Sequence, residues 1–400
     1  MERILTAELP AHTGQRVRLQ GWLHRKRELS RVSFLVLRDR AGLAQIVVDA
    51  AEPLSLLPET VLEIEGVAVS NAQAPGGVEV HEPALRVLAE PAEQPPVELH
   101  RPEPKESLPT RLDAAPIALR HPVVRERFRK TAAAVHAFRA TLDGLGFVEI
   151  QSPKIVAAAT ESGASVFPVD WFGRGAYLAQ SPQFYKQTMV GVFERVYEVG
   201  PVFRAEPHET ARHLAEYVSL DAELGFIEDH HDVIAVARGA VRAMIDAVGE
   251  TPPDEVPIVD FDAVRSGDEP DLSPEDERRV CREHGELVVV EGFPMAKRPF
   301  YTYPDPKNPA RSRGFDILYR GLEIVTGGQR LHRYEDYRHA LAARGLGEEP
   351  FAGYLDAFRY GMPPHGGFAL GLERFMAQAL RLANVREATL FPRDRNRLLP

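Results

Sequence analysis

The sequence predicts an α+β protein with two domains: an N-terminal β-barrel of the OB type and a larger antiparallel β-sheet flanked by helices. Five short strand patterns fill most of residues 1–92, whereas helical patterns mix with apolar strands from residue 113 onwards. Between them, residues 93–112 are rich in proline and poor in large apolar side chains, which is typical of a linker. We therefore expect domains at 1–92 and 113–400, joined by a hinge.

The composition is that of an ordinary globular protein, with 44% hydrophobic and 26% charged residues in a chain of 400. There is no run of about 18 apolar residues, and the first ten residues lack the apolar core of a signal peptide. We therefore expect a cytoplasmic protein without a membrane span. The net charge of −10 argues against unspecific nucleic-acid binding but allows a local basic patch. The single cysteine, Cys281, excludes an internal disulfide framework and a Cys-based zinc site.

The barrel prediction rests on five alternating or apolar segments, at 16–23, 32–38, 43–49, 61–69 and 78–88. We expect a short helical piece near 53–58 and a loop at 24–31, which concentrates basic residues after the first strand. Phe34 shares a strand face with Val32 and Val36. Its pattern therefore fits either a core residue or a stacking platform for a nucleic-acid base.

The second domain begins with an amphipathic helical pattern at 122–146, followed by a strand at 147–155. Further along we expect a helix, an acidic stretch and a buried strand, at 231–248, 268–279 and 288–294. We find no chemistry in the region 226–300, and we expect His230 and His231 to face solvent.

Residues 196–224 predict two antiparallel strands joined by a loop that is too long for a tight turn. Arg204 and Glu206 lie two residues apart, so an extended chain directs them to one face. Tyr217 and Asp221 follow in the second strand. Buried charges need partners, which either a ligand with phosphate and amine groups or an internal arginine–glutamate ladder would supply.

A second strand pair, within 314–335, holds Asp316 and Glu323 among apolar residues. Two carboxylates near a triphosphate suit Mg²⁺, a cation that takes oxygen ligands, although pairing with arginines is the alternative. The Gly-rich segment 365–375 would let a strand and a helix approach a nucleotide closely.

The segment FRAEPHETARHLAEY, at 203–217, resembles motif 2 of the class II aminoacyl-tRNA synthetases. The segments 122–155 and 365–382 resemble motifs 1 and 3 of the same family, in the same order. Motif 1 forms the dimer interface in that family, so the resemblance implies a homodimer that binds ATP and Mg²⁺. The signature QSPQFYK, at 180–186, is similar to that of the aspartyl enzymes of the compact archaeal type.

This resemblance implies roles for individual residues. Arg204 and Arg374 become the catalytic cations on the α- and γ-phosphates of ATP, while Glu206 reads the adenine amino group. The implied ATP site comprises Arg204, Glu206, His213, Leu214, Tyr217, Glu323 and Arg374. The implied magnesium ligands are Asp316, Glu323 and Thr326, and the implied aspartate-binding residues are Glu161, Gln183, Lys186, Asp221 and Arg330.

In the Asp/Asn/Lys subgroup the OB barrel binds the anticodon, which implies contacts from His24, Arg25, Phe34, Gln45 and Pro75. Phe34 falls at the position that stacks on the central base, and Gln45 at the position that hydrogen-bonds it. His24 stands where enzymes restricted to tRNA(Asp) carry a bulky tryptophan, and the loop around Pro75 has no lysine. We therefore expect both tRNA(Asp) and tRNA(Asn) to be charged.

The resemblance thus implies that L-aspartate and ATP form aspartyl-adenylate, from which the aspartyl group passes to tRNA. Lys186 and Arg330 would present two positive charges to one small side chain, which favours aspartate over asparagine. Two alternatives stay open: an asparaginyl-tRNA synthetase of the same architecture, and an inactive paralogue that only binds nucleic acid or a partner.

Overall fold

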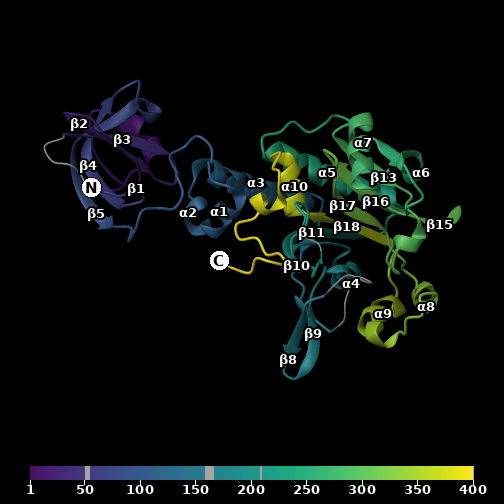
Figure 1. Cartoon of the computed structure of the whole chain (residues 1–400). Helices are drawn as coiled ribbons and strands as arrows, with labels where there is room; N and C mark the ends of the chain where they lie inside the picture. Colours follow the sequence, from purple (N-terminus) through teal and green to yellow (C-terminus); the bar gives the residue numbers. More distant parts are fainter. Residues whose placement is uncertain (50–54, 158–165, 208–209, 400) are drawn as a thin grey trace. The chain divides into compact units, whose positions relative to one another are not determined.

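The computed structural model describes residues 1–49, 55–157, 166–207 and 210–399 (Figure 1). These residues form two compact units, Met1–Arg125 and Glu126–Pro400. The expected hinge at 93–112 lies in the first unit, and the boundary falls in the first turn of helix α3 (Pro122–Gly144). Within the described ranges, no helix has both the length and the apolar character required to cross a membrane.

The first unit contains a closed five-stranded barrel in the order β1-β2-β3-β5-β4, which confirms the predicted OB-type fold. Its strands are β1 (Arg16–Glu28), β2 (Val32–Arg38), β3 (Leu43–Asp49), β4 (Val61–Ser70) and β5 (Val78–Ala89), and two short helices follow, α1 (Leu108–Asp113) and α2 (Ala115–Ala118). Inward-facing side chains such as Leu19, Leu35 and Ile64 are fully buried in the barrel. Alternation of inward and outward side chains along most of each strand produces this core.

Two details of the barrel differ from the prediction. The basic segment at 24–31 is largely strand, because β1 continues to Glu28. This strand pairs with β4 along its first half and with β2 along its second half, and a bulge between Leu23 and Arg25 separates the two halves. Residues 55–58 of the expected helical piece contain no helix, and 3₁₀ helices lie instead at Thr6–His12 and Pro75–Gly77.

The second unit is built on an eight-stranded sheet that is antiparallel except at its two edges. In spatial order its strands are β12 (Ile258–Asp260), β13 (Leu287–Glu291), β16 (Gly314–Tyr319), β17 (Leu322–Gln329), β18 (His365–Gly371), β11 (Glu216–Gly225), β10 (Arg195–Phe203) and β6 (Val148–Glu149).

Helices cover both faces of the sheet at its β13 side. Val289 packs into the core that includes α3 and α5 (His230–Ala247), whereas Val288 and Val290 pack under α6 (Phe261–Val264) and α7 (Pro274–His284). This alternation is the reason that β13 reads as a continuous apolar run. The remaining helices are α4 (Gln183–Phe193), α8 (Tyr334–Ala342), α9 (Ala352–Arg359) and α10 (Leu372–Ala379).

The structure corrects two further expectations, one for the segment 147–155 and one for His230. The segment 147–155 forms only β6 and the start of β7 (Ile155–Val156), because Pro153 has no amide hydrogen to continue a ladder. Strand β7 joins β8 (Pro168–Trp171) and β9 (Arg174–Leu178), and a separate pair is formed by β14 (Pro304–Asp305) and β15 (Asn308–Ser312).

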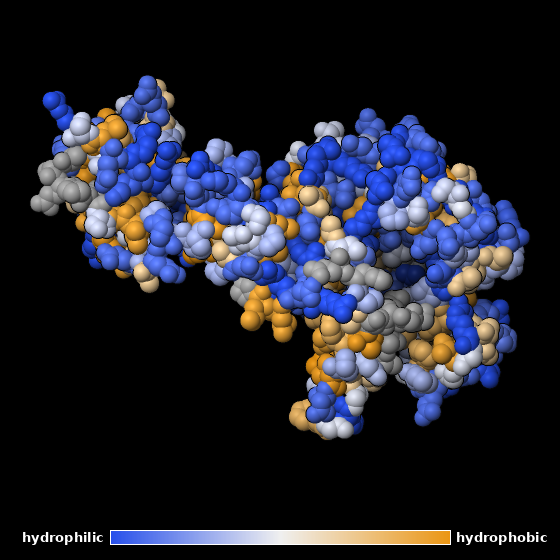
Figure 2. All heavy atoms as spheres, in the orientation of Figure 1, coloured by the Kyte–Doolittle hydropathy of each residue, from blue (hydrophilic) through white to orange (hydrophobic). Residues whose placement is uncertain are grey.

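Hydrophobic residues gather on the projecting β8–β9 hairpin (Figure 2), where Phe172 is 88% exposed. His230 is buried, contrary to the prediction, because it packs against Glu291.

Candidate active site

The hairpin of β10 and β11 carries one wall of the site. Its two strands pair without interruption from Arg195↔Leu224 to Phe203↔Glu216. Arg204 and Glu206 follow directly after β10 rather than lying inside a strand, and the backbone N–H of Arg204 donates to the carbonyl of Ala215 at 2.9 Å. The guanidinium carbon of Arg204 lies 5.7 Å from the centre of the Tyr217 ring, so the cation and the aromatic ring face the same space.

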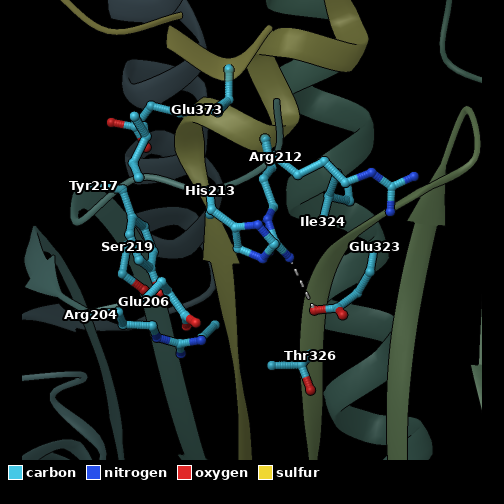
Figure 3. Close-up of a pocket in the computed structure, with 15 residues that line it drawn as sticks. Arg204, Glu206, Arg212, His213, Tyr217, Ser219, Glu323, Ile324, Thr326 and Glu373 are labelled. Carbon is cyan, nitrogen blue, oxygen red and sulfur yellow. Dashed lines mark ion pairs between the residues drawn. The ribbon is translucent and has the colours of Figure 1, made fainter. Parts of the chain in front are cut away.

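A pocket opens between this hairpin and strand β17 (Figure 3). Residues implied by the sequence as ATP or metal ligands line it: Arg204, Glu206, His213, Leu214, Tyr217, Glu323, Thr326 and Arg374. In Figure 3 the hairpin residues Arg204 and Tyr217 face Glu323 and Thr326 across the cavity. The fold therefore brings to one cavity residues that are up to 181 positions apart (385 minus 204) in the sequence.

Oxygen atoms gather where the pocket meets strands β16 and β17, although Asp316 itself does not line the pocket. Asp316 on β16 stands directly opposite Thr326 on β17, and Glu323 lies beyond a bulge at Leu318. Desolvation, together with the nearby carboxylate of Asp316, raises the pKa of Glu323 to about 7. Arg298 donates to Asp316 at 3.2 Å and to the hydroxyl of Thr326 at 3.4 Å. The donor set and the crowding of like charges both suit a hard cation such as Mg²⁺, while a guanidinium already occupies part of the space.

Next to the pocket lies a buried cluster of four charged side chains. The ammonium of Lys186, on α4, is 2.9 Å from Asp221 Oδ1 and 3.5 Å from Glu223 Oε2, and it donates to the carbonyl of Phe368 at 3.0 Å. Arg330 Nε lies 3.0 Å from Glu223 Oε1. Although burial opposes ionisation, Arg330 and Lys186 hold the pKa of Glu223 below its usual range.

This cluster corrects the charge argument made from the sequence. Lys186 and Arg330 do not face the substrate side chain as surplus positive charges, because Asp221 and Glu223 balance them within the protein. Selection of aspartate therefore cannot be derived from these two cations alone. The hairpin thus borders a pocket and carries an internal ladder of ion pairs, and the ligand of the pocket stays a prediction.

The hydroxyl of Ser219 connects the buried cluster with the pocket. Ser219 lines the pocket and donates to Asp221 Oδ2 at 2.5 Å. Gln183, another residue implied in aspartate binding, is buried, and its side-chain amide donates to Gln187 at 2.9 Å. Glu161, also implied in aspartate binding, lies outside the described residues.

The region 226–300, for which no chemistry was expected, contributes residues to the site. Glu277 of α7 accepts from Arg212, a pocket residue, at 2.8 Å, and burial raises the pKa of this carboxyl group. Arg298, described above, comes from the same region. The acidic stretch contains a weak sequence signal for this contribution. Ser273 and Asp276 form a capping box, so residues 274–284 form a helix with a defined inner face.

On the barrel, residues implied in anticodon binding gather on one outer face. Opposite pairs Arg27↔Phe34, Arg25↔Val36 and Val36↔Gln45 share this face, whereas Leu35 and Ile46 point inward. Phe34 is therefore not a core residue, and the guanidinium of Arg27 lies 5.4 Å from its ring centre. The side chain of Gln45 donates to Glu79 at 2.8 Å. Pro75 begins the short helix between β4 and β5.

His24 does not join this face. The bulge after Leu23 turns two consecutive side chains inward, and the ring of His24 is buried with Nδ1 3.2 Å from Arg38. Burial and Arg38 lower the pKa of His24 to about 4, so the ring is neutral at pH 7. In a regular strand without the bulge, alternation would have directed the ring of His24 into solvent.

An OB barrel and an antiparallel sheet with an arginine-lined pocket define the architecture of a class II synthetase. The chain belongs to the class II tRNA synthetases of the D, K and N group, which match residues 107–395, and an OB-fold nucleic acid binding domain matches residues 17–88.

Relatives align over the whole chain. An aspartate–tRNA(Asp/Asn) ligase of Thermus thermophilus is 44% identical, with 100% of each chain covered. An aspartate–tRNA(Asp/Asn) ligase of Deinococcus radiodurans is 45% identical, covering 100% of this chain and 99% of the relative. Among solved structures, the asparaginyl-tRNA synthetase of Pyrococcus horikoshii with asparaginyl-adenylate superposes with a TM-score of 0.93, at 30% identity and full coverage of both chains.

Proposed function

We propose that this protein ligates L-aspartate to tRNA(Asp) and to tRNA(Asn) in two steps, with ATP as the activating substrate. Aspartate attacks the α-phosphate, which releases pyrophosphate and gives aspartyl-adenylate, and the terminal ribose hydroxyl of the tRNA then takes the aspartyl group. The observation that carries the proposal is the pocket in which Arg204, Glu206, Tyr217 and Arg374 converge.

The first step needs orientation and charge neutralisation rather than a protein nucleophile. Arg204 and Arg374 would hold phosphate oxygens, because a guanidinium fork matches them with paired hydrogen bonds. Tyr217 would stack on the adenine, and the carboxylate of Glu206 would accept a hydrogen bond from its amino group. Arg212, which Glu277 holds at the rim, would add a cation near the distal phosphates.

Asp316, Glu323 and Thr326 would hold Mg²⁺ between them, and their oxygen donors fit this ion. When bound, the ion would neutralise charge on the phosphates. The contact of Arg298 with Asp316 and Thr326 shows that this corner accepts a positive charge.

The amino-acid pocket would be the buried cluster beneath Ser219. Arg330 and Lys186 would exchange part of their bonding from Glu223 and Asp221 to the side-chain carboxylate of aspartate, while Asp221 would accept from the substrate ammonium. The names of the two relatives, both aspartate–tRNA(Asp/Asn) ligases, support aspartate over asparagine and support the wider tRNA choice. The outer face with Arg25, Phe34 and Gln45 supports anticodon binding by the barrel.

A homodimer in the cytoplasm completes the proposal. Leu145 and Val148, next to and on the edge strand β6, are each at least 40% exposed, in the segment that resembles motif 1. An apolar sheet edge of this kind is normally covered in a folded protein, and a second copy of the chain would cover it.

Pyrophosphate exchange with each amino acid, followed by charging of each purified tRNA, tests the proposal. We expect exchange that depends on aspartate and aspartylation of both tRNAs. Comparable exchange with asparagine would favour an asparaginyl enzyme instead. Absence of exchange with either amino acid, in protein that still binds tRNA, would favour the inactive paralogue.

A further inference from the structure

Arg298 reaches into the oxygen corner, a name we use for Asp316, Glu323 and Thr326, and the proposed function gives it no task there. Its Nη1 lies 3.4 Å from both Asp316 Oδ1 and the hydroxyl of Thr326, and its Nη2 lies 3.2 Å from Asp316 Oδ2. Asp316 and Thr326 are two of the three residues proposed above to hold Mg²⁺. A guanidinium and a metal ion therefore compete for the same acceptors.

The oxygen corner is balanced in charge without a metal ion. Arg298 pairs with Asp316, and Arg374 Nη1 lies 3.9 Å from Glu323 Oε1, so each carboxylate has a guanidinium beside it. A divalent ion added to this arrangement would meet two positive charges at short range. Because Asp316 is buried, water screens that repulsion poorly. The corner by itself is therefore a poor site for a divalent ion.

The contacts of Arg298 are long for an ion pair. Charge-assisted bonds between nitrogen and oxygen are about 2.7–2.9 Å in length. The buried pair of Arg38 and Glu59 has two such bonds, at 2.8 and 2.9 Å. The three contacts of Arg298 are 3.2–3.4 Å and are shared between two acceptors. This geometry indicates a guanidinium that exchanges its partners at little cost.

The ring of Phe293 holds the guanidinium by its face. The guanidinium carbon lies 4.1 Å from the ring centre, and Phe293 is itself buried. Stacking on an aromatic ring leaves the N–H groups at the edge of a guanidinium available for hydrogen bonds. Arg298 is therefore able to turn its edge from Asp316 to another acceptor without leaving the corner.

We propose that Arg298 is a resident counter-ion of the oxygen corner, which exchanges Asp316 for phosphate oxygens when ATP binds. This rests on the proposed function, since it takes ATP as the ligand of the pocket. In the free protein, Arg298 opposes the binding of a divalent ion. The triphosphate of ATP brings several negative charges and accepts the N–H groups of Arg298, which leaves Asp316 and Thr326 to the ion. Arg298 thus makes metal binding depend on the nucleotide.

Titration of the full chain with Mn²⁺, followed by the EPR signal of the free ion, tests this role. Without nucleotide, Arg298→Met should bind Mn²⁺ at least about tenfold more tightly than the wild type, because the opposing charge is gone. Arg311→Met is the matched control and should bind as the wild type does. The two arginine side chains are each 15% exposed, and Arg311 also lies over a phenylalanine, Phe261, but it pairs with Asp260 instead.

A second titration has an expected result of the opposite sign. In EDTA, calorimetry should show that a non-hydrolysable ATP analogue binds about tenfold more weakly to Arg298→Met, since the phosphates lose one guanidinium. An ion pair with a purely structural role would weaken both ligands or neither when it is removed. Arg298→Lys keeps the charge and should stay closer to the wild type than Arg298→Met in both titrations.

Mn²⁺ binding that Arg298→Met leaves unchanged or weakens would overturn the proposal, and so would analogue binding as tight as that of the wild type. Neither titration uses aspartate or tRNA, so the proposed function is tested separately. Both expected shifts in a protein without pyrophosphate exchange would support the role of Arg298 and reject the proposed activity. Exchange in the wild type without these shifts would reject the role of Arg298 alone.

Discussion

Replacement of Lys186 by methionine should destabilise the second unit strongly, because it removes one charge from a balanced buried cluster. Lys186 has no solvent exposure, and Asp221 is 1% exposed. After the change, two carboxylates share the single cation Arg330, which already pairs with Glu223. Leaving one buried charge without its partner costs about 3–5 kcal/mol. We therefore expect the free energy of unfolding of Lys186→Met to fall by about this amount.

The double variant Lys186→Met/Asp221→Asn separates charge imbalance from loss of packing. It removes one charge of each sign, so we expect it to recover roughly 2 kcal/mol or more relative to Lys186→Met alone. Urea unfolding of the wild type, both single variants and the double variant gives the coupling energy. Arg338→Met is the control, since it removes exposed ion pairs with Glu335 and Glu348 in the same unit and should change stability by less than about 1 kcal/mol. A double variant no more stable than Lys186→Met would refute the charge-balance argument.

Other predictions concern the remaining parts of the proposal. Phe34→Ala should weaken tRNA charging by roughly 1–3 kcal/mol, the usual contribution of one base–aromatic stack, and leave aspartate activation unchanged; a parallel fall in pyrophosphate exchange would contradict this. Arg204→Lys keeps the charge but loses the guanidinium fork, so kcat/KM for activation should fall about 10–100-fold, and wild-type kinetics would remove Arg204 from the phosphate site. Charging of tRNA(Asn) should stay within about a thousandfold of tRNA(Asp), a gap of roughly 4 kcal/mol, and a larger gap in kcat/KM would show a restricted enzyme. Burial lowers the pKa of His365 to about 4, below the value of 6.5 for the free side chain. The unfolded state therefore takes up the proton first, and this histidine should contribute a loss of roughly 3 kcal/mol of stability as the pH falls from 6.5 to 4; urea midpoints that do not fall over this range would contradict it.

The sequence predicted local features better than features that depend on distant partners. The hairpin of β10 and β11 and the pocket residues on it follow from patterns within about 30 residues. The extent of β1 does not, because its second half is fixed by pairing with β2 and its bulge hides His24. The partners Arg212 and Glu277 are 65 positions apart, so no local pattern connects them.

The same limit explains why the sequence did not predict the charge balance of the buried cluster around Lys186. Lys186 and Arg330 were each recognised, but their internal partners lie 35 and 107 positions away. The net charge of a site can be predicted from the cations of a motif only if the anions that pair with those cations are known. In this protein those anions come from β11, the second strand of the hairpin whose first strand leads into Arg204.

The hydroxyl of Ser219 has a consequence for how the two substrates influence each other. It carries one proton, which it donates to Asp221, and it also borders the pocket that we propose for ATP. A substrate that donates a hydrogen bond to Asp221 in the cluster frees the Ser219 hydroxyl to donate into the pocket. Conversely, a substrate in the pocket that accepts the hydrogen bond of Ser219 leaves Asp221 free to accept from another donor. The two affinities are then linked, and linkage is reciprocal: aspartate changes the dissociation constant of ATP by the same factor as ATP changes that of aspartate.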